Sequence, residues 1–140
     1  MKYKKYICLI IAMLVIVSAT ANLSAQQKSL FDSSIQPLTC EENVSYIANA
    51  LTEGLKSDDS LYVIVIARLG DGERSKKLNT SRQQEINGYL KMLRVKNVVT
   101  AEGERKKGLG QLEFYIAGNL LLTLPVTRNS KLDLTACWFL

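Results

Sequence analysis

The sequence predicts an α/β (α+β) two-layer sandwich, with two helices packed on one mixed sheet in the order strand-helix-strand-helix-strand-strand. The continuous apolar run 61–67 is typical of a buried central strand. An apolar period over 79–93 indicates a helix between this run and a short strand at 98–101. Gly118-Asn119, between two strand-like runs, indicates a hairpin. A right-handed crossover through the helix would make strands 61–67 and 98–101 parallel, whereas a hairpin is antiparallel.

The first predicted elements precede the central strand. Residues 35–39 are expected to form a short edge strand, because Pro37 is tolerated at an edge but not inside a sheet. A helix is expected over 41–56, with two glutamates in its first turn. Its apolar residues repeat at helical spacing: Val44, Ile47, Ala48, Leu51 and Leu55.

The second helix has a polar start, where Asn79, Thr80 or Ser81 can cap it. Its buried face is marked by Ile86, Leu90 and Leu93. After the strand at 98–101, residues 111–117 alternate between apolar and polar side chains, and 120–124 are apolar again. A looser tail is expected after Pro125.

The amino terminus has the layout of a secretory signal peptide over residues 1–25. Three lysines precede an apolar stretch at 7–17, which is short for a membrane span, and small residues suited to cleavage follow near Ala21 and Ala25. An uncleaved signal anchor is the alternative. We therefore expect an exported protein, periplasmic or secreted, with no membrane span after cleavage. A polar lead-in at 26–34 then precedes a single domain at 35–140.

Removal of the signal peptide weakens the basic character of the chain. The full sequence has 18 Lys and Arg against 13 Asp and Glu. Residues 1–25 contain three Lys and no acid, so 15 basic residues remain against 13 acidic ones. A protein that is so nearly neutral gives little support to nucleic-acid binding, and we expect no nucleic-acid partner.

Two cysteines remain after export, Cys40 and Cys137, since Cys8 lies in the signal peptide. An even pair in an exported chain is a disulfide candidate, and two unrelated buried thiols are the alternative. With no histidine and no CxxC pair, no metal site is expected.

Basic loops follow both strands of the predicted parallel pair, at 72–77 and at 103–107. The carboxyl ends of parallel strands meet at one rim of the sheet, where ligands of α/β proteins commonly bind. The cations of these loops suggest an acidic ligand, and ordinary solvated turns are the alternative. They are Arg74, Lys76, Lys77, Arg105, Lys106 and Lys107.

Three segments carry short motifs of one known domain family. Residues 78–83, Leu-Asn-Thr-Ser-Arg-Gln, are similar to a helix that opens Leu-Ser-x-x-Arg-Ala. Residues 102–104, Glu-Gly-Glu, are similar to part of a Gly-x-Gly-Glu element, and residues 110–114 to a closing Arg-Arg-Val-Glu strand. Over roughly 35–118 the chain thus resembles the OmpA-like domain, a periplasmic peptidoglycan-binding module also found in peptidoglycan-associated lipoproteins and motor stators.

The resemblance implies a binding site for the diaminopimelate group of a peptidoglycan peptide. In that family a helix arginine holds a carboxylate and a turn aspartate holds an ammonium group. Arg82 matches the arginine. Asp71 is one place later than the family aspartate, and Gly70 occupies the expected position.

The sequence gives little support to catalysis. Without histidine, proton transfer would fall to Asp, Glu, Lys or Tyr, and no nucleophile or phosphate-loop motif is present. Glu73 and Glu104 are conceivable paired carboxylates, but each has a neighbouring arginine, which favours a salt bridge. We therefore expect no enzyme activity and no cofactor.

Together these patterns predict an exported, non-catalytic cell-envelope binding domain for a peptidoglycan peptide or another acidic ligand. The alternative is a secreted, disulfide-stabilised scaffold that has lost the family site. Such a scaffold would bind another protein through its sheet edge or through the aromatic tail at Trp138 and Phe139.

Overall fold

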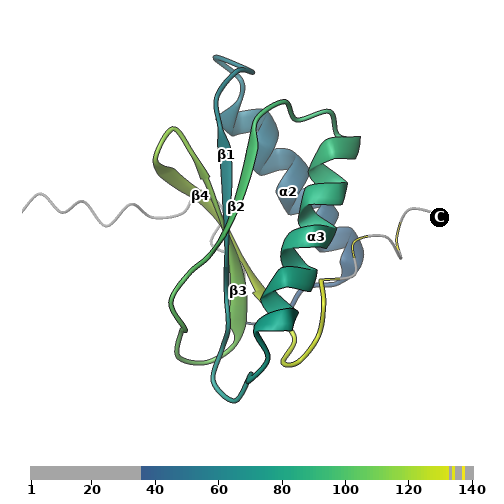
Figure 1. The fold of residues 1–140 in the computed structure, drawn as a ribbon. Coiled ribbons are helices and arrows are strands. Elements are labelled where there is room, and N and C mark those ends of the chain that lie inside the picture. The colour runs from purple at the N-terminus through teal and green to yellow at the C-terminus, as the bar shows by residue number, and fades with distance from the viewer. Residues whose placement is uncertain (1–35, 133, 135–136, 138–140) are drawn as a thin grey trace, which may run out of the picture.

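The computed structural model describes residues 36–132, 134 and 137, and shows two helices covering one face of a four-stranded sheet (Figure 1). In chain order the elements are α2 (Cys40–Gly54), β1 (Val63–Arg68), α3 (Lys76–Met92), β2 (Val98–Glu102), β3 (Gly110–Ile116) and β4 (Asn119–Val126). The predicted α+β fold with two helices on a mixed sheet is confirmed.

The strands lie in the order β2-β1-β3-β4. β1 and β2 are parallel, with Val63 opposite Val98, as the crossover through α3 predicted. β3 is antiparallel to both β1 and β4. The β3–β4 hairpin is present, but its turn is Ala117-Gly118, one residue earlier than predicted. Both turn residues have positive φ, at 50° and 79°, as tight hairpin turns require.

The predicted edge strand at 35–39 is wrong for the described part of that range, because residues 36–39 form no strand. Thr39 instead caps α2. Its hydroxyl accepts a hydrogen bond from the Glu42 backbone N–H (3.3 Å), and the Glu42 carboxylate accepts one from the Thr39 N–H (2.8 Å). This reciprocal capping box satisfies two backbone donors at the helix start and commits Thr39 to the helix.

α3 begins three residues before the predicted start, so Asn79, Thr80 and Ser81 are not its caps. Asn79 is buried, and its side-chain amide donates to the Ala67 carbonyl oxygen at 3.2 Å. The polar residue near the helix start therefore fastens α3 to the end of β1.

The core lies between the helices and the inner face of the sheet. Alternate residues of β1 are buried, as expected for a strand that presents one face to helices. The fully buried apolar side chains include Ile47 of α2, Ile86 of α3, Val65 of β1, Phe114 of β3 and Leu122 of β4.

Cys40, the first residue of α2, is joined to Cys137 by a disulfide with a Cα–Cα distance of 5.9 Å, so the predicted bridge is present. It spans 97 positions of sequence and holds the segment after β4 against the start of α2.

Several predicted features lie outside the described residues: the signal peptide at 1–25, the lead-in at 26–34 and the aromatic tail at 138–139. Within the described part of the chain, no helix has the length and apolar character needed to cross a membrane.

Candidate functional site

The two basic loops lie against each other at the carboxyl end of the parallel pair (Figure 1). The Asp71 N–H donates to the Gly108 carbonyl oxygen (2.7 Å), and the Gly108 N–H donates to the Asp71 carboxylate (2.8 Å). The Lys106 N–H donates to Leu69 O (2.9 Å). The prediction that both loops share one rim of the sheet therefore agrees with the structure.

Gly70 allows this close approach of the loops. A Cβ atom at this position would lie 2.3 Å from the Gly110 nitrogen and 2.5 Å from the Gly108 oxygen, which are backbone atoms with little freedom to move. The Gly70 carbonyl oxygen also accepts a hydrogen bond from the Arg105 guanidinium. Glycine at position 70 thus has a packing role at the meeting point of the loops.

All six predicted loop cations are exposed, and none forms an ion pair with another residue of the described chain. Lys76 and Lys77, predicted in the first loop, instead form the start of α3, so the predicted end of that loop at 77 is wrong. We call the six cations the basic rim: Arg74, Lys76, Lys77, Arg105, Lys106 and Lys107. Arg128, which the sequence analysis missed, lies beside them, because a Cβ atom on Gly72 would be 4.0 Å from its Nε. No sequence signal links Arg128 to these loops, since it follows β4 and only the fold brings it there.

Arg82 lies inside the protein. Its guanidinium makes a two-point ion pair with Glu73, with Nη1–Oε2 at 3.0 Å and Nη2–Oε1 at 2.6 Å. Both side chains have an exposed fraction of 0%. The carboxylate bound to Arg82 therefore comes from the chain itself, from the loop between β1 and α3.

The Arg82–Glu73 pair joins three segments of the chain. Arg82 also donates to the carbonyl oxygen of Ser130 (3.1 Å) and, at 3.5 Å, to that of Thr127, in the segment after β4. Glu73 accepts from the backbone N–H groups of Gly70 (2.8 Å) and Asn129 (2.9 Å). The pair thus fixes the first rim loop, α3 and the tail relative to one another.

The pKa of Glu73 reflects these contacts. Burial would raise it, but the hydrogen bonds from Arg82, Gly70 and Asn129 and the charge of Arg82 outweigh burial and lower the pKa to about 2. Glu73 is therefore ionised at neutral pH. It is paired with Arg82 rather than with its sequence neighbour Arg74, and it is not exposed as a catalytic carboxylate would need to be.

A second polar network lies on the sheet face that carries no helix. Glu113 of β3, whose side chain is 5% exposed, forms an ion pair with Arg68 of β1, with Nε–Oε2 at 2.9 Å. The Tyr115 hydroxyl donates to Glu113 at 2.9 Å, and Arg68 also donates to the Glu104 carbonyl oxygen at 3.3 Å. Interaction with Glu113 raises the pKa of Arg68, while burial, followed by the Glu113 hydrogen bond, raises that of Tyr115. This network ties the second rim loop to the sheet.

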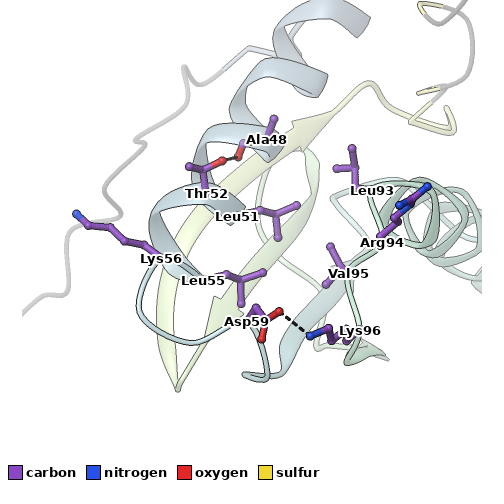
Figure 2. A pocket seen from close by; sticks show the side chains of 10 residues that line it. All are labelled: Ala48, Leu51, Thr52, Leu55, Lys56, Asp59, Leu93, Arg94, Val95 and Lys96. Atoms are coloured by element: carbon purple, nitrogen blue, oxygen red, sulfur yellow. Dashed lines mark hydrogen bonds and ion pairs between the residues drawn. The ribbon is translucent and has the colours of Figure 1, made fainter.

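A pocket of about 400 Å³ lies near the amino end of the parallel pair, away from the basic rim. Leu51 of α2 and Leu55, which follows that helix, face Leu93 and Val95 across it, and the Lys96–Asp59 ion pair (2.6 Å) spans one end (Figure 2). The side chain of Lys56 extends away from the apolar walls. Such a pocket can accept an apolar group against these side chains and an acidic group near Arg94, which also lines it.

No group of His, Cys, Asp and Glu side chains in the described part of the chain is arranged to hold a metal ion. Comparison with protein-family models, with curated proteins and with solved structures found no match to this chain. The OmpA-like resemblance therefore stays a prediction from the sequence motifs.

Proposed function

We propose that the protein is an exported, non-catalytic binding domain of the cell envelope that takes an acidic ligand at the basic rim. A peptidoglycan peptide is the first ligand class to test, because its carboxylates complement exposed Arg and Lys side chains. The support for this function comes from one observation: hydrogen bonds between the two loops bring Arg74 close to Arg105, Lys106 and Lys107, and α3 begins with Lys76 and Lys77 directly after the first loop. All six cations are exposed and form no ion pair with the described residues.

Arg82 is a positioning residue in this function. Since Glu73 already occupies its guanidinium, Arg82 holds the rim loop in place instead of contacting the ligand. Asp71 has the same kind of role, because one of its carboxylate oxygens accepts the Gly108 N–H across the two loops. The exposed cations then contact the ligand.

Co-sedimentation with purified peptidoglycan sacculi tests this function. The wild-type protein is expected to sediment with sacculi at low salt and to be released as salt rises, since exposed charges are screened. The variant Lys106→Glu/Lys107→Glu should lose most of the bound fraction. Its matched control, Lys56→Glu/Lys91→Glu, makes the same change of charge at exposed positions outside the rim and should bind like wild type.

Both variants should keep the wild-type thermal midpoint within a few degrees, because exposed charges contribute little stability. Failure of the wild-type protein to sediment at low salt would exclude peptidoglycan. Equal losses in the rim variant and in the control would show that binding follows net charge and does not use the rim.

A second function, a secreted scaffold for protein–protein interaction, is favoured by the pocket between α2 and the segment after α3, which has both apolar and charged side chains in its lining. In this role an apolar side chain of a partner protein fills the pocket. The position at Arg82 that a peptidoglycan carboxylate would take in an OmpA-like domain is then occupied by Glu73. Leu93→Glu places a charge at the partly exposed wall of the pocket and should abolish capture of envelope proteins by the immobilised domain. Capture that is unchanged by Leu93→Glu would contradict this role for the pocket.

A further inference from the structure

The outer edge of β2 has free backbone groups. The Val63 N–H donates to the Asn97 oxygen (2.9 Å), and the Gly103 N–H donates to the Ala67 oxygen (3.0 Å). Since a residue of a parallel strand directs its N–H and C=O groups to the same side, these two contacts set the phase of the whole strand. The groups of Val98, Thr100 and Glu102 therefore point away from β1, and no hydrogen bond joins them to the described residues.

The two edges of the sheet differ in their protection. β4 carries Pro125, and its pairing with β3 has an irregularity between Phe114 and Tyr115. Proline and bulges are devices that keep an edge strand from pairing with another chain. β2 contains no proline and pairs with β1 without a break in register. Its Val99 is 44% exposed and lies opposite Ile64 in that register, so an apolar surface continues to the strand edge.

We propose that β2 pairs antiparallel with β2 of a second copy of this chain, about a two-fold axis at Thr100. In this register Val98 lies opposite the partner's Glu102 and Thr100 opposite the partner's Thr100. These are the residues whose backbone groups point outward, and each such pair exchanges two hydrogen bonds. The two four-stranded sheets then form one continuous sheet.

Opposite charges near the two ends of β2 favour a second copy of this chain as the partner. Extension of the same register places Lys96 opposite the partner's Glu104, and by symmetry Glu104 opposite the partner's Lys96. Opposite charges that face each other across neighbouring strands are favourable. A shift of the register by two residues would leave one end of β2 unpaired, so full pairing and charge matching select the same arrangement.

Lys96 already has one acidic neighbour, Asp59, at 2.6 Å. Both side chains are largely exposed, at 63% and 71%, and surface ion pairs of this kind contribute little stability. Lys96 can therefore pair with the partner's Glu104 instead, with little loss of folding stability. The variant Asp59→Asn removes this intramolecular ion pair and should leave the association of the two copies unchanged.

Sedimentation velocity over a wide range of protein concentration tests the pairing. The wild-type protein is expected to pass from monomer to dimer as concentration rises. Lys96→Glu and Glu104→Lys each place like charges at both ends of the paired strands and should each give a monomer. An equimolar mixture of these two variants restores opposite charges at both ends, so the mixture should dimerise although neither component does.

Amide hydrogen exchange gives a second measurement. In the dilute monomer the amides of Val98, Thr100 and Glu102 should exchange faster than those of Val99 and Ala101, and this alternation should disappear as the dimer forms. Thr100→Pro removes an outward N–H and should also give a monomer. The proposal is overturned if the wild-type protein stays monomeric at the highest soluble concentration. It is equally overturned if a dimer persists in both charge variants, or if their mixture stays monomeric.

Discussion

Arg82 and Glu73 form a two-point ion pair whose two side chains are fully excluded from solvent, and this pair anchors the first loop of the basic rim. It ties the loop that carries Arg74 to α3, whose first residues are Lys76 and Lys77. Hydrogen bonds to Ser130 and Asn129 extend the anchor into the tail, so loop, helix and tail are held together.

Removal of one member of this pair should be strongly destabilising. Arg82→Leu leaves the buried Glu73 carboxylate without its cation, and a loss of about 3–5 kcal/mol in the free energy of unfolding is expected. Urea denaturation would measure it. Arg82→Leu/Glu73→Gln should lose less than the two single variants together, because no unpaired charge remains. A loss below about 1 kcal/mol in Arg82→Leu would contradict the buried pairing.

Glu73 should also make stability depend on acid. Its pKa in the folded protein, about 2, is below the ordinary value of 4.5, so the folded state binds its proton less readily than the unfolded state. The stabilisation is present above pH 4.5 and is lost as pH falls toward 2. Thermal midpoints of wild type and Glu73→Gln should therefore converge over this interval. A constant difference down to pH 2 would count against ionised Glu73 as the source.

The Cys40–Cys137 disulfide should contribute substantially to stability. A bridge that closes 97 positions of sequence stabilises by about 4–5 kcal/mol in the chain-entropy model. Cys137→Ser should lower the thermal midpoint while the far-ultraviolet circular dichroism spectrum stays unchanged at low temperature. Reduction of the wild-type protein should lower its midpoint by a similar amount, and the variant should not respond to reductant.

Substitution by alanine should have opposite effects on stability at two glycines. Gly70→Ala forces a Cβ atom onto backbone atoms of the facing loop and should cost about 1–3 kcal/mol, with weaker ligand binding at the rim. Gly88→Ala, in α3, meets no atom within 4 Å and should stabilise by about 0.5–1 kcal/mol. Chemical denaturation of both variants checks the signs. A stabilised Gly70→Ala would mean that the loops are not packed as closely as described.

Export can be tested directly. If residues 1–25 are a signal peptide, the mature chain should begin between Asn22 and Gln26. Intact-mass analysis of protein from the envelope fraction would locate the new amino terminus. Full-length protein recovered from membranes would favour the uncleaved anchor.

The sequence predicted most of the fold because the deciding signals are local. The apolar run before Arg68 indicated a central strand, and the helical period after it made the next strand parallel to the first. Thr39 was assigned to an edge strand because the sequence of a helix-capping residue does not differ from that of an edge-strand residue until its hydrogen-bond partners are known. Its role depends on Glu42, which the structure places within hydrogen-bonding distance.

The site was predicted less completely, since its contacts join distant parts of the chain. The loops at Asp71 and Gly108 could be expected at one rim from the parallel strands alone. The carboxylate that pairs with Arg82 could not be predicted from the sequence. Glu73 has Arg74 as its sequence neighbour, and only the packing of the folded chain selects Arg82 as its partner. Arg128 was missed for the same reason: its position depends on the path of the tail.

The disulfide has a mechanical consequence. A pulling force applied to the chain before Cys40 and after Cys137 passes through the covalent bridge, so every helix and strand between them is relieved of load. The oxidised domain then behaves as a link of fixed length, whereas the reduced domain can be extended by unravelling. In a protein held between two anchoring points, the redox state of one cysteine pair would decide whether tension reaches the rim loops at all.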